Sequence, residues 1–239
     1  MKIYIIRHAE PDYEHHTITE RGKKEAAALG KRYNASDFDA IYCSPLERAQ
    51  ATCRAVVKDE FKRVHVVDWL RELNHFHAIL KGGEKQVCWD FKPKYIQKHP
   101  SLLQPNFLES MEVRDGVFEK HLFELWDNFD KLLAENGYVR DGYFYRVKKR
   151  NRKKIVLFCH FGVMSALVSH MMNIPFTNAA QFMICPPSGV TVFISEERDK
   201  GIAQFRMSRY GDTTHLGKEG IIRSFSGRFC ELFTDDTRH

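Results

Sequence analysis

The stretch Ile3-Tyr4-Ile5-Ile6-Arg7-His8 begins with a nearly unbroken apolar run and ends in two polar residues. A short apolar run without alternation is typical of a strand that is buried on both faces of a parallel sheet. Residues 155–159 repeat this pattern as Ile-Val-Leu-Phe-Cys, and His160 follows directly. We therefore expect two buried strands, each with a histidine at its carboxyl end.

Four further stretches have strand character, and segments with helical character separate them along the chain. These stretches are residues 40–43, 64–67, 190–194 and 203–207. Such alternation predicts an α/β fold, a three-layer sandwich with a mostly parallel central sheet and helices on both faces. The polar turn at 196–201 predicts that the last two strands form an antiparallel hairpin at a sheet edge.

Helix signals occupy the intervals between these strands. Thr19 is placed to cap a helix that runs to about residue 33. Ser44-Pro45-Leu46-Glu47 has the form of a capping box with proline at the first helical position, which predicts a helix directly after the strand that ends at residue 43. Apolar spacing predicts two more helices, one within 113–135 and one over 162–172.

Residues 73–112 have no regular pattern and mix aromatic residues, lysines and prolines. We expect an insertion that lies over the carboxyl ends of the strands. Such an insertion serves as a lid or a substrate-selecting wall in many α/β enzymes, and a surface loop without a role is the alternative. We expect residues 1–239 to form a single domain, with a substrate-selecting insertion at 73–150.

Composition favours a soluble cytoplasmic protein. Of the 239 residues, 43% are hydrophobic and 28% are charged, which is ordinary for a globular domain. The sequence has no apolar run of the roughly 18 residues that a membrane span requires, and its first residues lack the features of a secretory signal. The six cysteines form no CxxC pair, so we expect reduced thiols and a cytoplasmic location.

The net charge of +6 is compatible with anionic small substrates or with nucleic acid. The basic run at 148–154 precedes a buried strand and lacks the interleaved aromatic residues that stack on bases. It is better explained as a solvated loop. We therefore expect neither a nucleic-acid nor a membrane partner, and the sequence does not indicate an oligomeric state.

Phosphate-binding residue types follow three of the predicted strands. Arg7 and His8 follow the first strand, Arg48 lies in the helix after residues 40–43, and His160 follows the strand at 155–159. Ligands bind at the carboxyl ends of strands in open parallel sheets, and helix N-termini there favour phosphate. Each residue has an alternative role, as a turn histidine or an exposed ion-pair partner. Their joint occurrence nevertheless predicts an anion site.

Four motifs give the sequence a family resemblance. They are Arg7-His8-Ala9-Glu10, Thr19-Glu20-Arg21-Gly22, Ser44-Pro45-Leu46-Glu47-Arg48-Ala49-Gln50-Ala51-Thr52 and His160-Phe161-Gly162. In order and spacing they resemble the histidine phosphatase superfamily, which includes cofactor-dependent phosphoglycerate mutases and broad phosphatases. The resemblance implies that His8 attacks phosphorus and becomes a transient phosphohistidine. It also implies that Arg7, Arg48 and His160 hold the phosphate oxygens. The proposed chemistry requires no metal, and we expect no cofactor.

The resemblance also implies a general acid. Leu70-Arg71-Glu72-Leu73 resembles the family's acid site, so we expect Glu72 to protonate the leaving oxygen. Asp90, Glu84 and Glu109 are alternatives, and Glu72 could instead be a surface glutamate paired with Arg71. The acid must carry a pKa that burial raises against the effect of nearby arginines.

The two histidines have different requirements. As a nucleophile, His8 must be neutral with one ring nitrogen free, so we expect a backbone carbonyl or a similar acceptor to hold its other N–H. His160 is more useful as a charged donor.

Several positions depart from the family's pattern. Ala9 and Phe161 replace glycines. We expect these larger side chains to affect the size of substrate that the pocket accepts more than the chemistry of the reaction. The asparagine that the family's phosphatases carry after the first motif is missing, and His15, His16 or Thr17 could replace its contact.

The remaining histidines give weaker signals. The pairs His15-His16 and His75-Phe76-His77 match no strong zinc spacing, so we expect no metal site. We expect a structural role for His215.

The resulting prediction is a phosphomonoester hydrolase of the histidine acid type, acting on a small phosphorylated metabolite. A phosphoglycerate mutase-like phosphomutase would use the same residues, although residues 73–83 do not resemble the corresponding mutase stretch. A catalytically silent module that binds phosphate or RNA is the third possibility, and the complete set of His8, Arg7, Arg48 and His160 argues against it.

Overall fold

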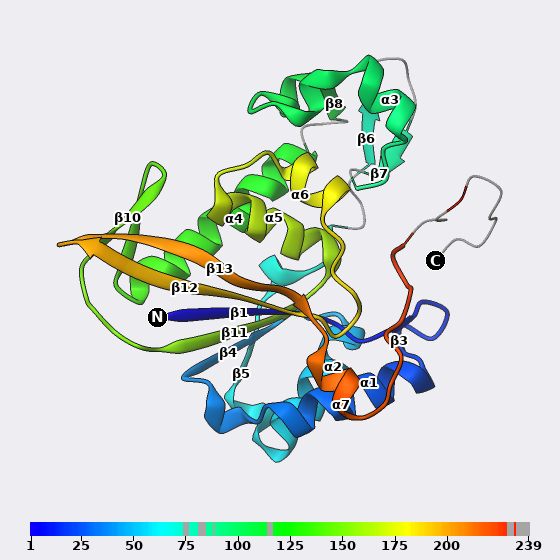
Figure 1. Ribbon diagram of the computed structural model, residues 1–239, viewed down its shortest axis with the longest axis vertical. Helices are drawn as coiled ribbons and strands as arrows, with labels where there is room; N and C mark the ends of the chain where they lie inside the picture. The colour runs from blue at the N-terminus through cyan, green and yellow to red at the C-terminus, as the bar shows by residue number, and fades with distance from the viewer. Residues whose placement is uncertain (74–76, 81–84, 88, 114–116, 229–231, 233–239) are drawn as a thin grey trace.

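The computed structural model describes residues 1–73, 77–80, 85–87, 89–113, 117–228 and 232. Its centre is an eight-stranded sheet with the order β5-β4-β11-β1-β12-β13-β10-β9 (Figure 1). The strands are β1 (Lys2–Arg7), β4 (Ala40–Cys43), β5 (Val64–Val66), β9 (Tyr138–Asp141), β10 (Phe144–Val147), β11 (Lys154–Cys159), β12 (Val190–Asp199) and β13 (Ile202–Asp212). Six of them point the same way, and β12 and β10 run against them.

The predicted first strand is the middle of this sheet. Strand β1 pairs in parallel with β11 and antiparallel with β12, so that Ile5 lies opposite both Leu157 and Thr191. Ile3, Ile5 and Ile6 are fully buried. The apolar run therefore forms a strand that is buried on both faces of the sheet, as its lack of alternation predicted.

Helices cover both faces of the sheet (Figure 1). One face packs against α1 (Glu20–Arg32) and α2 (Glu47–Val57), with α7 (Thr214–Lys218) beside α1. The other packs against α4 (Val117–Glu135), α5 (Phe161–Met172) and α6 (Phe176–Phe182). In β11, Leu157 faces the α4 and α5 side and Phe158 the α1 and α2 side, so the strand contributes to two cores. The three-layer α/β prediction is confirmed.

A smaller sheet forms part of the predicted insertion. It consists of β6 (His77–Leu80), β7 (Lys85–Val87) and β8 (Met111–Val113), in the order β7-β6-β8, and α3 (Pro93–Lys98) lies beside it in Figure 1. The remaining short elements are β2 (Pro11–Asp12), β3 (Thr17–Ile18) and 3₁₀ turns at Ala35–Asp37, Lys58–Arg63, Asp68–Leu70, Pro100–Leu103 and Phe107–Ser110. Within the described residues, no helix combines the length and apolar character needed to cross a bilayer.

Helix α4 lies within its predicted range, 113–135. Two other sequence predictions need correction. Helix α2 begins at Glu47, because Ser44 does not cap it: the Ser44 hydroxyl accepts from the Leu46 N–H at 3.2 Å and faces His160. The hairpin of β12 and β13 is correct, but it is internal, because β10 pairs with β13 and β9 with β10.

The missed hairpin of β9 and β10 had a signal in the sequence. Asp141 of β9 pairs with Phe144 of β10, so the two loop residues are Gly142 and Tyr143, and Gly142 has a φ of +59°. A glycine between two short runs of strand-forming residues is a hairpin signal, because the favoured two-residue turns require positive φ at the first loop position.

Candidate active site

The ring of His8 is held in one tautomer at the end of β1. Its Nδ1 lies 2.7 Å from the carbonyl oxygen of Ala9. Since a carbonyl only accepts hydrogen bonds, Nδ1 carries the proton and Nε2 keeps a free lone pair. Burial lowers the pKa of His8 well below its usual value, and Arg7 and Arg48 add to this effect while the Ala9 carbonyl opposes it. The expectation of a neutral histidine held by a backbone carbonyl is confirmed.

Arg7 and Arg48 are buried beside this ring. Arg7 donates from Nη1 to the carbonyl of Cys185 at 2.6 Å, and its guanidinium lies 5.4 Å from the Phe161 ring centre. Arg48, in the first turn of α2, lies 5.7 Å from the ring centre of Tyr13. Among the described residues, neither Nε of these arginines has an acceptor. Two buried cations with unused donors form a site that an anion would stabilise.

His160 completes the group from the end of β11. Its ring centre is 5.1 Å from that of His8, and its Nε2 lies 2.7 Å from the hydroxyl oxygen of Ser44. Burial lowers the pKa of His160 well below its usual value, with His8, Arg48 and Arg7 acting in the same direction. Burial thus disfavours the charged form in which His160 would serve as a donor, and an anion between these groups would favour protonation.

Glu72 lies at the N-terminus of α5. Its carboxylate accepts hydrogen bonds from the backbone N–H groups of Gly162 at 3.2 Å, Val163 at 3.3 Å and Leu73 at 2.9 Å. Burial raises the pKa of Glu72, against the lowering effects of these hydrogen bonds and of Arg48. Arg71 pairs with Asp68 at 2.8 Å instead of with Glu72. The carboxyl thus has the raised pKa that a general acid needs.

Gly162 is required by this arrangement. A Cβ at residue 162 would lie 2.7 Å from the Trp89 ring and 2.8 Å from a Glu72 oxygen. Trp89 follows β7, so it brings the insertion against the end of β11 and beside Glu72.

Of the other candidate acids that the structure describes, neither Glu109 nor Asp90 is as buried as Glu72. Glu109 is exposed and accepts from the Asn106 side chain at 2.9 Å. Asp90 is half-buried, with its backbone N–H bonded to the Val87 carbonyl. Glu84 lies outside the described residues. Glu72 remains the strongest candidate among the acids that the structure describes.

The remaining histidines are placed elsewhere. His15 is exposed and bonds Asp12 at 2.9 Å, and His16 is also exposed, with a φ of +55°. The Nε2 of His215 is buried and lies 3.0 Å from the Ser188 hydroxyl. Thr17 is half-buried in β3. His75 and Phe76 lie outside the described residues.

Two features of the site were not predicted. The Thr52 hydroxyl accepts from the Ala9 N–H at 2.9 Å and donates to the Arg48 carbonyl at 2.8 Å, so it connects two motifs. The carbonyl of Ser226, near the end of the described chain, lies 3.4 Å from Nη1 of Arg7. Spacing within the Ser44–Thr52 motif could have suggested Thr52, whereas no sequence signal pointed to Ser226.

Two buried arginines, two buried histidines and a buried glutamate lie at one end of this doubly covered α/β sheet, and such a group of side chains is suited to binding a phosphate ester. Residues 3–82 match the model of branch 1 of the histidine phosphatase superfamily. The relatives and structures below extend the similarity over most of the chain.

Among curated proteins, phosphoserine phosphatase 1 of Hydrogenobacter thermophilus is 24% identical over 228 residues, covering 91% of this chain and 95% of the relative. The adenosylcobalamin/alpha-ribazole phosphatase of Escherichia coli is 24% identical over 193 residues, covering 73% and 81%. A crystal structure of phosphoserine phosphatase from Entamoeba histolytica, in complex with 3-phosphoglyceric acid, has a TM-score of 0.60 and 17% identity, covering 90% of this chain and 98% of that one.

Proposed function

We propose that this protein is a phosphomonoester hydrolase of the histidine acid type, that it acts on a small phosphorylated metabolite, and that His8 is its nucleophile. The observation that carries the proposal is the 2.7 Å contact between Nδ1 of His8 and the Ala9 carbonyl, because it leaves Nε2 free beside Arg7, Arg48 and His160. The phosphatases among the relatives support the same class of reaction.

In the first half of the proposed reaction, the lone pair on Nε2 of His8 forms a bond to phosphorus. The bond between phosphorus and the leaving oxygen breaks, and protonated Glu72 gives that oxygen its proton. Arg7, Arg48 and His160 bind the other three oxygens and compensate their charge, which is the main requirement of phosphoryl transfer. The alcohol departs and His8 is left as a phosphohistidine.

In the second half, ionised Glu72 takes a proton from water while the water oxygen bonds to phosphorus. The bond between phosphorus and nitrogen breaks, its electron pair returns to Nε2, and inorganic phosphate leaves. Glu72 is protonated again, so one carboxyl serves both as acid and as base. Since the two arginines supply the positive charge, we propose that the reaction is independent of metal ions.

We further propose a cytoplasmic enzyme that forms one domain over residues 1–239. Cys43, Cys53, Cys159 and Cys185 are buried free thiols, which suits a reducing compartment. Leu102 and Phe107 of the insertion belong to the same hydrophobic core as β1 and β11. The position of Trp89 beside Glu72 supports a substrate-selecting role for the insertion at 73–150.

Replacing the nucleophile tests the proposal. His8→Ala should abolish hydrolysis of an aryl phosphate, while its circular dichroism and melting temperature stay those of a folded protein. His65→Ala is the matched control, because His65 lies on the exposed edge strand β5 and stacks on Tyr42. Wild-type enzyme mixed with labelled substrate and quenched in base should retain an acid-labile label that His8→Ala lacks.

Two outcomes would contradict the proposal. Undiminished hydrolysis by His8→Ala would exclude His8 as the nucleophile. Interconversion of phosphoglycerate isomers without release of phosphate would identify a phosphomutase instead of a hydrolase.

A further inference from the structure

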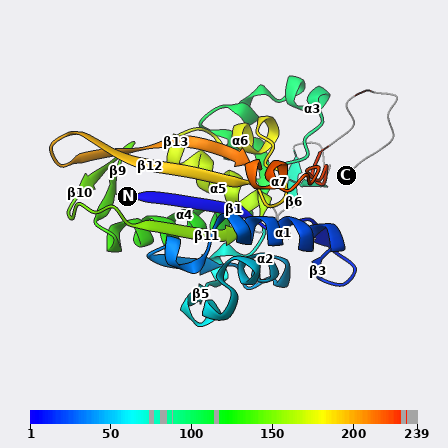
Figure 2. The ribbon, with the colours of Figure 1, turned by 60° about the horizontal axis from the view of Figure 1, so that its bottom comes forward.

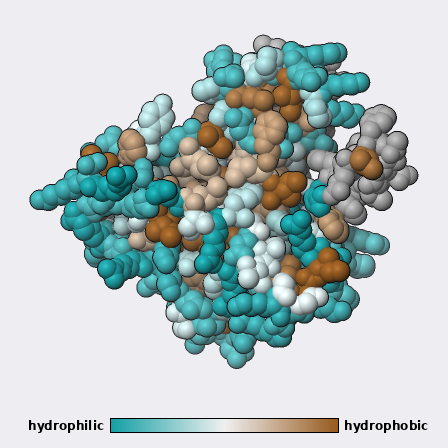
Figure 3. Space-filling view, viewed as in Figure 1, coloured by the Kyte–Doolittle hydropathy of each residue, from teal (hydrophilic) through white to brown (hydrophobic). Residues whose placement is uncertain are grey.

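The turn between α6 and β12 runs from the surface into the core beside the candidate active site. Ile184 is 54% exposed, at the apolar surface that follows α6 in Figure 3, whereas residues 185–190 are all buried. The Pro186 carbonyl accepts from the Gly189 N–H at 3.0 Å, which closes a four-residue turn over residues 186–189. Because this turn is buried, its polar groups require hydrogen-bond partners.

Ser188, in this turn, has a backbone conformation that favours glycine. Its φ is +56°, in the left-handed region that is unfavourable for a residue with a Cβ. Pro187 precedes it, and a turn with proline at its second position and positive φ at its third usually has glycine or asparagine at the third. Serine is therefore strained here. Strain of this kind gathers at functional sites, so the contacts of Ser188 indicate what the strain serves.

The N–H of Ser188 holds the backbone of the candidate nucleophile. It donates to the His8 carbonyl at 3.0 Å, and the N–H of the same peptide unit, which belongs to Ala9, donates to the Thr52 hydroxyl at 2.9 Å. The His8 N–H donates to the Cys159 carbonyl at 2.9 Å. Since β1 ends one residue earlier, these three hydrogen bonds fix the backbone from which the His8 ring projects.

The Ser188 hydroxyl contacts a buried histidine. Its oxygen lies 3.0 Å from Nε2 of His215, and the two residues are 0% and 1% exposed. Among the described residues, Nδ1 of His215 has no hydrogen-bond partner. The serine hydroxyl is therefore the group that satisfies this imidazole within the part of the chain that the structure describes.

His215 is anchored outside the turn. It lies in α7, which Figures 1 and 2 both place beside α1, near the end of the sheet where β1 terminates. Asp212, two residues before α7, accepts from Arg32 of α1 at 2.7 Å. Burial lowers the pKa of His215 to about 4, with Arg32 acting in the same direction and Asp212 against it. A neutral imidazole on a helix that is tied to α1 thus holds the hydroxyl of the turn.

We propose that Ser188 is a positioning residue for the nucleophile. Its hydroxyl, held by His215, keeps the turn in the left-handed conformation from which the Ser188 N–H fixes the His8 carbonyl. The inference rests on the proposed hydrolase function and assigns to that reaction a pair of residues that act through His8. A misplacement of about 1 Å at a reacting group can lower a rate about 100-fold, so a single backbone hydrogen bond is enough to matter.

Two replacements of Ser188 separate the hydroxyl from the backbone conformation. Ser188→Ala loses the hydroxyl and keeps a Cβ, so nothing opposes the strain, and kcat/KM for an aryl phosphate should fall about 10–100-fold. Ser188→Gly also loses the hydroxyl, but glycine adopts positive φ freely, so kcat/KM should return to within about threefold of the wild-type value. The measurements are made on folded enzyme, well below the melting temperature of each variant.

Asn173→Ala is the matched control. Asn173 also has a φ of +56°, and its side chain accepts from Arg140 at the far end of α5 from His160. Alanine is strained at such a position, so this variant should lower the melting temperature as Ser188→Ala does, with kcat/KM kept within about twofold. His215→Ala should reduce kcat/KM as Ser188→Ala does, and the double variant should lose no more than either, because the two side chains form one contact.

The ring of His8 can also be observed without catalysis. In enzyme with isotope-labelled histidine, the nuclear magnetic resonance signals of the His8 ring are those that His8→Ala lacks. They should shift in Ser188→Ala, return towards their wild-type positions in Ser188→Gly, and stay unchanged in Asn173→Ala.

Unchanged kcat/KM and unshifted His8 signals in folded Ser188→Ala would overturn the inference, as would a loss in Ser188→Gly equal to that in Ser188→Ala. If the wild-type enzyme hydrolysed no phosphate ester, the proposed function would be overturned instead. The His8 signals would still show whether Ser188 positions the ring.

Discussion

His8 and Glu72 receive opposite protonation states from one cause. Burial disfavours the charged form of each group, so it lowers the pKa of the imidazole and raises the pKa of the carboxyl. A neutral nucleophile and a protonated acid are the states in which the proposed reaction begins. The same residues in open water would have the reverse protonation at slightly acidic pH.

The pH profile of kcat/KM should reflect these two shifts. Glu72 must be protonated, so activity falls as pH rises through its raised pKa; His8 must be neutral, so activity falls only when pH drops through its lowered pKa. In Glu72→Gln the alkaline limb should disappear, while Glu109→Gln, at an exposed acid, keeps it. Titration of the substrate affects the wild-type enzyme and both variants equally. If Glu72→Gln kept the alkaline limb, that limb would have to come from the titration of a group other than Glu72.

The leaving group should decide how much Glu72→Gln loses. An alkyl phosphate needs a proton on its leaving oxygen, and loss of general acid catalysis typically costs about 10²–10⁴-fold. An aryl phosphate with an acidic phenol needs little protonation. We expect kcat/KM, which includes only the steps up to formation of the phosphohistidine, to fall by this factor for the alkyl ester and to fall much less for the aryl ester. Equal losses on both esters would indicate a structural role at the N-terminus of α5.

At the scale of elements, a close contact between helices α1 and α2 depends on a glycine. A Cβ on Gly30 of α1 would lie 2.1 Å from the backbone carbonyl oxygen of Ala55 in α2. A backbone oxygen in a helix cannot turn away as a side chain can. The separation of α1 and α2, which also contributes to the position of Arg48, is therefore set by the missing side chain.

Gly30→Ala should destabilise the protein although alanine is the better helix former by about 1 kcal/mol. Overpacking of this kind costs about 1–3 kcal/mol. Gly217→Ala in α7 is the matched control, since nothing lies within 4 Å of its Cβ position, and it should be neutral or slightly stabilising. Urea unfolding measures both, and equal stabilities of the two variants would contradict the packing argument.

Local signals allowed several elements to be predicted, and contacts across the sequence explain those that were not. Thr19 caps α1 through a bond to Gly22 three residues away, so the sequence alone indicates it. Ser44 fails to cap α2 because its hydroxyl bonds His160, which is 116 residues distant. Likewise, four motifs indicated His8, Arg7, Arg48 and His160. The approach of Ser226 to Arg7 depends on packing that no local pattern encodes.

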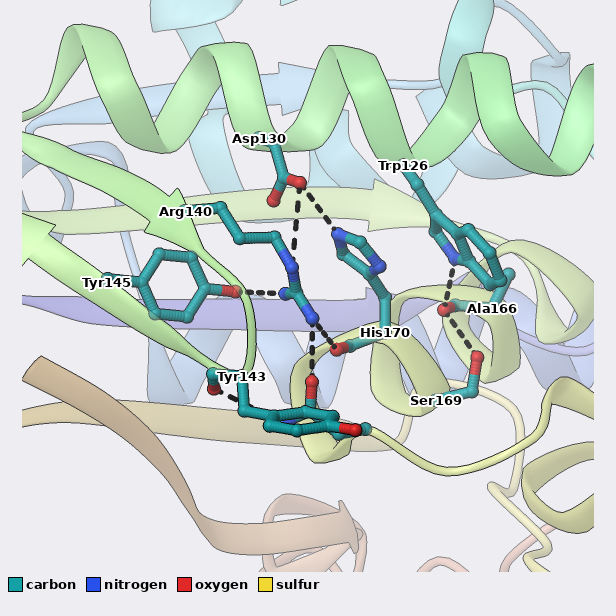
Figure 4. A network of polar contacts seen from close by, with 9 residues as sticks. Trp126, Asp130, Arg140, Tyr143, Tyr145, Ala166, Ser169 and His170 are labelled. Atoms are coloured by element: carbon teal, nitrogen blue, oxygen red, sulfur yellow. Dashed lines mark hydrogen bonds and ion pairs between the residues drawn. The ribbon is translucent and has the colours of Figure 1, made fainter. Parts of the chain in front are cut away.

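At the scale of the whole molecule, one polar network joins the outer hairpin to two helices. Arg140 of β9 donates to the Tyr145 hydroxyl at 2.8 Å and to the Asn173 side chain at 2.7 Å (Figure 4). Asp130 of α4 bonds His170 of α5 at 2.9 Å and lies 3.9 Å from Nε of Arg140. The edge of the sheet is thereby tied to the helical layer.

Arg140→Ala should lower the free energy of unfolding by about 1–3 kcal/mol, because partly buried acceptors lose their donor. Arg146→Ala is the control on the same hairpin, since its ion pair with Asp141 is exposed and contributes little. Chemical denaturation measures both variants. If Arg146→Ala lowered the free energy of unfolding as much as Arg140→Ala, the destabilisation would come from any change in the hairpin and not from loss of the polar network.

The position of β1 has a consequence for how the protein is made. This strand is synthesised long before both of its partners, β11 and β12, which begin only at residues 154 and 190. Contacts so distant along the chain form late and slowly during folding. The nascent polypeptide therefore carries its future nucleophile without a binding site around it until β11 and β12 have been made.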